Sequence, residues 1–155
     1  RPILCLAACE LTGENSDNAM STAVAIEMIH TMSLIHDDLQ DRDLLRRGLP
    51  TIWNRFGDHT AINLGDYFIS ASFEILSKIK VDPHLRCKAI TELSKAIKQT
   101  VKGQSVEILS RSDFNLKMQD YDRIYSDYFS EKEYRYYPLK LYQLIYHLKD
   151  ILYLG

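Results

Sequence analysis

The sequence predicts an all-α domain, and three observations support this fold class. Apolar residues recur at the spacing of helices along most of the 155-residue chain. Only six glycines and four prolines interrupt this pattern. Hydrophobic residues make up 46% of the chain, which is enough to form the core of one domain.

Two helices are expected before Pro50. The first covers residues 3–11 and is followed by a short turn. Ser16 or Asp17 is expected to cap the second helix, because either side chain can accept a hydrogen bond from a free backbone amide. This long helix runs from about residue 18 to 45 and ends near Pro50, which lacks the amide hydrogen that a helix would use.

Two further helices are expected downstream. One begins at Asp58 or Thr60 and continues to about Lys80. The pair Asp82-Pro83 predicts a turn, because aspartate and proline both favour turn conformations. The last of these helices covers about residues 84–110.

A change in composition separates residues 1–110 from residues 111–155. Nine of the ten tyrosines lie at or beyond Tyr121, whereas alanine and threonine are absent after Thr100. We expect residues 111–155 to form a divergent, tyrosine-rich helical tail.

The composition also argues against several classes of function. A formal net charge of −2 leaves no basic excess, so no binding to nucleic acid is expected. No apolar run reaches the roughly 20 residues of a membrane-spanning helix, so no transmembrane segment is expected. Three cysteines are too few for a disulfide framework, which favours a reducing compartment. Cys5 and Cys9 lie in an apolar run, which favours core packing for both. We therefore expect a cytoplasmic protein, with the plastid as the alternative.

The segment SLIHDDLQDRDLLRRG, residues 33–48, places aspartates directly after an apolar run and then adds a pair of arginines. One face of the expected helix passes from apolar to anionic, through Ile26, His30, Ser33, Asp37 and Asp41. Carboxylates at this spacing repel each other unless a cation lies between them, and Mg²⁺ prefers carboxylate oxygens combined with substrate phosphates. Arg46 and Arg47 carry guanidinium groups suited to bidentate contact with phosphate. The order predicts a magnesium-dependent diphosphate site, although DRDLLRR taken alone is more typical of a solvated face with salt bridges.

The sequence resembles the trans-isoprenyl diphosphate synthases, also called polyprenyl synthases, and within them the geranylgeranyl and farnesyl diphosphate synthases. The matching motifs follow the family's order: RP at the start, AIEMIHTMSLIHDD, DDLQD at residues 37–41, RRGLPT from Arg46, AINLGD ending at Asp66, and Gly103-Gln104. The resemblance implies an isoprenoid synthase-type helical bundle, incomplete in this chain. Residues 1–110 would be the amino-terminal part of a polyprenyl synthase domain.

The resemblance also implies a prenyltransferase that condenses isopentenyl diphosphate with an allylic diphosphate. Asp37 and Asp41 would bind Mg²⁺, and Asp38 would support them as a third residue of the catalytic motif. Arg46 would contact the allylic diphosphate. The other substrate-binding residues that the resemblance implies are Arg1, His30, Arg47 and Gln104.

Product length in the family depends on the residues just before the first aspartate, where bulky aromatics stop elongation early. Met32 and Ser33 occupy these positions here, and neither is aromatic. The resemblance therefore implies a product longer than farnesyl diphosphate, with geranylgeranyl diphosphate expected. We expect a homodimer, or a heterodimer with a complete subunit.

Two other functions stay open. The family carries a lysine-threonine pair and a second aspartate-rich motif downstream of Gln104, and this chain has neither. The chain is therefore expected to be a fragment or inactive on its own, and a non-catalytic helical subunit that pairs with an active prenyltransferase is an alternative. His36-Asp37 is also typical of all-α metal-dependent phosphohydrolases, with His30, His59 or His84 as further ligands, but that class gives no reason for RRG or AINLGD.

Overall fold

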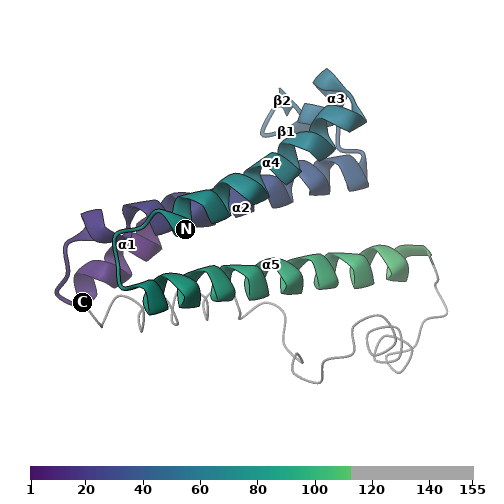
Figure 1. Ribbon diagram of the computed structural model, residues 1–155. Helices are drawn as coiled ribbons and strands as arrows, with labels where there is room; N and C mark the ends of the chain where they lie inside the picture. The colour runs from purple at the N-terminus through teal and green to yellow at the C-terminus, as the bar shows by residue number, and fades with distance from the viewer. Residues whose placement is uncertain (113–155) are drawn as a thin grey trace.

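The computed structural model describes residues 1–112, which form a bundle of helices (Figure 1). The all-α fold class is confirmed. The expected helical tail at residues 111–155 lies almost entirely outside the described residues. The elements are α1 (Pro2–Leu11), the 3-10 helix η1 (Ser16–Ala19), α2 (Met20–Asp41), β1 (Leu45–Arg46), β2 (Leu49–Pro50), α3 (Ile52–Phe56), α4 (Asp58–Ser77) and α5 (Pro83–Ser112).

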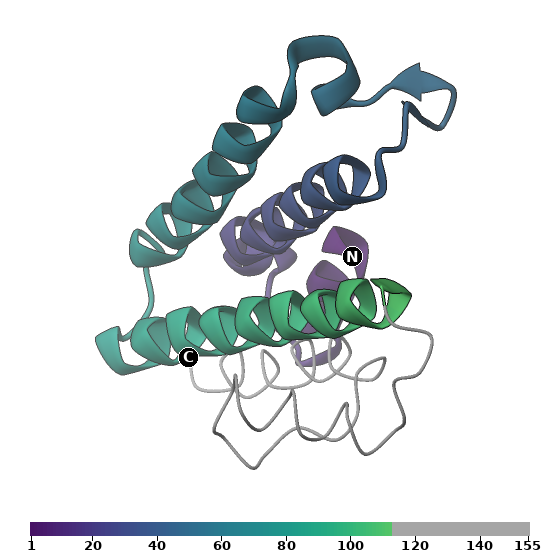
Figure 2. The ribbon, with the colours of Figure 1, turned by 90° about the vertical axis from the view of Figure 1, so that its right-hand side faces the viewer.

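Helices α2 and α4 pack side by side and form the centre of the described fold (Figure 1). Helix α1 lies at one end of this pair, and the β1–β2 hairpin and α3 lie at the other. Helix α5 follows α4 after a short turn and lies on one side of the pair (Figure 2). Within residues 1–112, no helix is long and apolar enough to cross a membrane.

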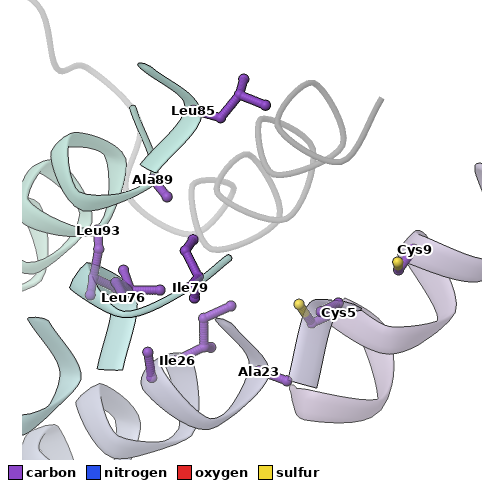
Figure 3. Close-up of a cluster of buried hydrophobic side chains, with 11 residues drawn as sticks. Cys5, Cys9, Ala23, Ile26, Leu76, Ile79, Leu85, Ala89 and Leu93 are labelled. Atoms are coloured by element: carbon purple, nitrogen blue, oxygen red, sulfur yellow. The ribbon is translucent and has the colours of Figure 1, made fainter. Parts of the chain in front are cut away.

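The hydrophobic core lies at the α1 end of the bundle, where side chains from all four long helices meet (Figure 3). Ile26 of α2 points toward Leu76 at the end of α4, and Leu93 of α5 closes the cluster. Cys5 and Cys9 of α1 are fully buried there, as their apolar setting predicts. Burial, with a smaller contribution from Cys9, raises the pKa of the Cys5 thiol to about 11, so Cys5 stays protonated and acts as a packing residue.

The expected helix at about residues 18–45 is wrong at its C-terminal end and begins two residues late. It begins at Met20, because residues 16–19 form the tighter η1, whose cap is Asn15 rather than Ser16 or Asp17. It ends at Asp41, because Arg42 adopts a left-handed conformation with φ of 59° and its amide donates to the Asp38 carbonyl.

A two-residue hairpin replaces the end of the expected helix. Leu45 pairs with Pro50 and Arg46 with Leu49, leaving Arg47 and Gly48 as the connection. Both have positive φ, 54° and 80°, as in a type I′ turn that follows the twist of a hairpin. The turn cannot be recognised from the sequence, because asparagine or glycine usually occupies the first turn position, which is Arg47 here.

The remaining boundaries agree with expectation within a few residues. Helices α1 and α5 are confirmed, and α4 begins at Asp58 but ends at Ser77 rather than near Lys80. The Arg86 guanidinium donates to the carbonyls of Ser77, at 3.2 Å, and Val81, at 3.3 Å, which stabilises the chain where α4 ends. The expected turn before α5 is present, with the Asp82 carboxylate accepting the His84 amide at 2.8 Å.

Candidate functional site

Three aspartates lie in the last turns of α2, at the end of the bundle away from the core cluster. Asp37 and Asp41 are four residues apart on one face of the helix, while Asp38 is turned aside. Their exposure differs: Asp38 is buried, Asp37 is half-buried and Asp41 is exposed. Asp37 and Asp41 can therefore meet a ligand, whereas Asp38 faces the protein.

The hairpin brings Arg46 onto these aspartates. Its Nε donates to Oδ1 of Asp38 at 2.6 Å, and its Nη2 donates to Oδ2 of Asp37 at 3.3 Å. The hydrogen bond with Asp38 raises the pKa of Arg46. Asp38 is only 5% exposed, so its carboxylate meets this guanidinium in place of water, and the ion pair joins the hairpin to the end of α2.

Further contacts hold the segment that carries Arg46. The backbone carbonyl of Asp43 accepts hydrogen bonds from the Thr51 hydroxyl, at 2.7 Å, and from the Trp53 indole, at 2.8 Å. Arg42 pairs with Asp58 at 2.9 Å and lies 5.1 Å from the centre of the Trp53 ring. These contacts close the base of the hairpin and attach the residues before it to α3 and α4.

Helix α5 contributes Gln104 to the same place. Its side-chain amide donates to Oδ1 of Asp37 at 3.3 Å, so two residues from distant parts of the chain contact this carboxylate. The pKa of Asp37 is nevertheless raised, first by burial and then by the negative charge of Asp41, against the opposing effect of Arg46. A divalent cation between the two carboxylates would relieve this repulsion, and oxygen ligands suit Mg²⁺.

His30 and Arg1 lie near this cluster. His30 is half-buried two turns before Asp37, and its pKa is lowered, first by burial and then by the positive charge of Arg1. Arg46 acts on His30 in the same direction, though more weakly. The three basic side chains are therefore close enough to interact electrostatically, as a common anion-binding role requires.

The other residues singled out by sequence are placed differently. Arg47 is exposed at the hairpin tip. Met32 is buried at 3% exposure, and the Ser33 hydroxyl donates to the His30 carbonyl of its own helix at 2.8 Å. None of these side chains contacts the aspartates among the hydrogen bonds and ion pairs of the described residues, so their roles stay predictions.

Sequence reasoning missed the position of His36. Its ring packs against Gly65 of α4, where its Nε2 is buried without a hydrogen-bond partner among the described residues. His59 and His84, the other candidate hydrolase ligands, are exposed. Over residues 1–112, no group of three or more His, Cys, Asp or Glu side chains is arranged to hold a metal ion by itself.

Comparison with known proteins gives a consistent result. The sequence matches the Polyprenyl synthetase family over residues 1–145. It is 46% identical over 134 residues to geranylgeranyl pyrophosphate synthase 7, chloroplastic, of Arabidopsis thaliana, a match that covers 81% of this chain and 39% of that protein. It is 49% identical over 118 residues to the heterodimeric geranylgeranyl pyrophosphate synthase large subunit 1, chloroplastic, of the same plant, covering 71% of this chain and 32% of that one.

Solved structures share the fold. An FPP/GFPP synthase from Zymomonas mobilis superposes with a TM-score of 0.80 and 31% identity, covering 98% of this chain and 54% of that one. A geranylgeranyl pyrophosphate synthetase from Pyrococcus horikoshii gives a TM-score of 0.80 at 28% identity, covering 98% and 44%. The chain thus spans about two fifths of the length of the first curated relative, 39%.

Proposed function

This chain belongs to the polyprenyl synthetase family, and on that premise we propose that it acts in the condensation of isopentenyl diphosphate with an allylic diphosphate. The observation that carries the proposal is the convergence of Asp37, Asp38, Arg46 and Gln104, from three separate segments, at one end of the bundle. Carboxylates and a guanidinium group at one place suit a diphosphate that is bound partly through metal and partly directly.

Asp37 and Asp41 are the proposed metal ligands. They are the accessible pair on one face of α2, and the raised pKa of Asp37 reflects a site where added positive charge is favourable. Mg²⁺ held by these two carboxylates would supply positive charge that neutralises the leaving diphosphate. Gln104 keeps the Asp37 carboxylate in place by donating to its Oδ1.

Arg46 is the proposed direct contact to the allylic diphosphate. Asp38 holds its Nε, which orients the planar group and directs Nη2 to the side where Asp37 lies. A diphosphate approaching Asp37 would meet this edge of the guanidinium. Arg1, His30 and Arg47 are then the candidates for binding isopentenyl diphosphate.

The reaction breaks the bond between the allylic carbon and the diphosphate oxygen. The double bond of isopentenyl diphosphate attacks the resulting allylic carbon, and loss of one proton restores a double bond in the product. Arg46 and Mg²⁺ held at Asp37 and Asp41 would stabilise the departing diphosphate, since negative charge develops there as the bond breaks.

The proposed product is geranylgeranyl diphosphate. Met32 and Ser33, before the first aspartate, leave no aromatic ring to stop elongation early. The relatives named geranylgeranyl pyrophosphate synthase support the same product, and the word chloroplastic in their names favours the plastid over the cytoplasm.

A subunit that pairs with an active prenyltransferase is the second candidate. The relative named as the large subunit of a heterodimeric synthase supports pairing of this kind. Large apolar side chains on α4 are open to a partner, with Ile62 at 44% and Tyr67 at 64% exposure. The same exposed side chains would also suit the interface of a homodimer.

One assay distinguishes these functions. The full chain is incubated with Mg²⁺, farnesyl diphosphate and labelled isopentenyl diphosphate, alone and with a complete geranylgeranyl diphosphate synthase. Product from the chain alone, lost in Asp37→Ala, would support the enzyme. A change only in the rate or product of the added synthase would support the subunit. No product, no effect on the synthase and no binding of diphosphate would contradict both.

A further inference from the structure

The contact between His36 and Gly65 has no role in the function proposed above. Gly65 is buried within α4, and a Cβ added to it would overlap the imidazole of His36. The added atom would lie 2.6 Å from Cδ2 and 2.7 Å from Cε1, and nearer still to Nε2. The imidazole therefore points its Nε2 directly at the space that only glycine leaves open.

This contact lies next to the proposed metal ligands. His36 immediately precedes Asp37, on the helix whose packing against α4 forms the centre of the fold. The neighbouring residues Ile35 and Asp38 are buried, so this turn of α2 is fixed against the protein on the side away from Asp37. A shift of α2 relative to α4 at this level would move Asp37 away from Arg46 and Gln104, which lie on other segments.

The chemistry of the imidazole argues against simple space filling. Nε2 is buried and has no hydrogen-bond partner among the described residues, which is unfavourable for a polar atom. An apolar side chain would avoid that penalty. A buried polar atom of this kind, beside a proposed metal ligand, needs a reason other than packing.

We propose that His36 is a positioning residue whose contact with Gly65 sets the spacing of α2 and α4 at the level of Asp37, and so the geometry of the metal-binding carboxylates. This inference rests on the proposed function, because it assumes that Asp37 and Asp41 bind a divalent cation. It predicts that the two residues are coupled: a methyl group at position 65 is harmful only while the His36 ring is present.

The test measures binding of Mn²⁺ in the presence of inorganic pyrophosphate, by electron paramagnetic resonance on the full chain. Gly65→Ala should weaken Mn²⁺ binding by about tenfold or more, as loss of residues that orient metal ligands commonly does. The double variant His36→Ala/Gly65→Ala should recover at least half of that loss on a logarithmic scale. His36→Ala alone, which adds no overlap, serves if Gly65→Ala does not fold, and it should weaken binding by several-fold.

Leu76→Ala is the matched control. It removes buried packing from the same helix near its C-terminal end, in the core cluster and away from Asp37. It should lower stability but leave Mn²⁺ affinity within about twofold, because a purely structural defect far from the site does not move the carboxylates.

The outcomes separate the two proposals. Failure of the unsubstituted chain to bind Mn²⁺ with pyrophosphate would contradict the proposed function, and this inference with it. Normal binding by the unsubstituted chain together with unchanged binding by Gly65→Ala and His36→Ala would overturn the inference alone. The same holds if the double variant binds no better than Gly65→Ala, since the two positions would then be uncoupled.

Discussion

The ion pair between Asp38 and Arg46 should stabilise the fold as well as orient the arginine. Asp38 is 5% exposed, and its Oδ1 accepts from Arg46 Nε at 2.6 Å. Asp38→Asn keeps the shape and one acceptor oxygen but removes the negative charge. The hairpin would lose its strongest link to α2, while the Arg46 side chain, 34% exposed, could still be hydrated.

The expected cost follows from these contacts. Hydrogen bonds to charged groups contribute about 1.5–3 kcal/mol, roughly twice the value for neutral pairs. Because the amide retains a weaker bond and Arg46 is partly hydrated, Asp38→Asn should lower the free energy of unfolding by about 1–2 kcal/mol. Asp37→Asn should change it by less than about 0.5 kcal/mol, since the 3.3 Å contact with Arg46 is offset by repulsion from Asp41.

Urea unfolding of the full chain, followed by far-UV circular dichroism and extrapolated to water, measures both values. Asp43→Asn is the control, because it makes the same change at an exposed aspartate of the same segment. The reasoning would be refuted if Asp38→Asn were no more destabilising than Asp43→Asn, as the buried carboxylate would then contribute nothing to attaching the hairpin.

Four further predictions concern the site and the core. Arg47→Asn should raise the free energy of unfolding, measured in urea, by up to about 1 kcal/mol, because asparagine tolerates the left-handed conformation that Arg47 holds at φ of 54°. A free energy of unfolding below that of the unsubstituted chain would contradict the turn assignment. Leu76→Ala should lower the free energy of unfolding by about 2–5 kcal/mol, since this side chain is 2% exposed. A loss below about 1 kcal/mol would contradict this and show that neighbouring side chains fill the cavity. The pKa of His30 is lower in the folded chain than in the unfolded chain, so the unfolded chain binds more protons as the pH falls. The contribution of His30 to stability is therefore present above pH 6.5 and lost at lower pH. His30→Gln should therefore flatten the decline in stability as the pH falls below about 6.5, relative to the unsubstituted chain, and identical pH slopes for the two chains would be inconsistent with this. If the protein turns over, Asp41→Ala should abolish product formation in the labelled isopentenyl diphosphate assay, whereas normal turnover would make Asp41 a solvated surface residue.

Helical periodicity predicts the long helices well, because burial repeats along each of them. Helices α1, α4 and α5 lie close to their expected positions. The error in α2 arises where local conformation outweighs periodicity. Arg42 and Arg47 both adopt positive φ, which arginine rarely does, and contacts that form only in the folded chain, among them Arg46 with Asp38 and Arg42 with Asp58, stabilise that arrangement.

The site was predicted only in part for a related reason. Residues four apart on one helix can be placed on a common face from sequence, so Asp37 and Asp41 could be paired in advance. Contacts between segments cannot be read from spacing. The bond between Asp38 and Arg46, the approach of Gln104 to Asp37 and the packing of His36 on Gly65 all depend on how α2, the hairpin, α4 and α5 are arranged.

Calorimetric titration of the full chain with farnesyl thiodiphosphate, a slowly ionising allylic diphosphate analogue, tests the central claim most directly. The titration is made with and without Mg²⁺, for the unsubstituted chain and for Asp37→Ala. We expect binding that requires Mg²⁺ and is lost in Asp37→Ala, because that carboxylate is a proposed metal ligand. Binding of equal strength without Mg²⁺, or Mg²⁺-dependent binding that survives in Asp37→Ala, would contradict a diphosphate site built on the α2 aspartates.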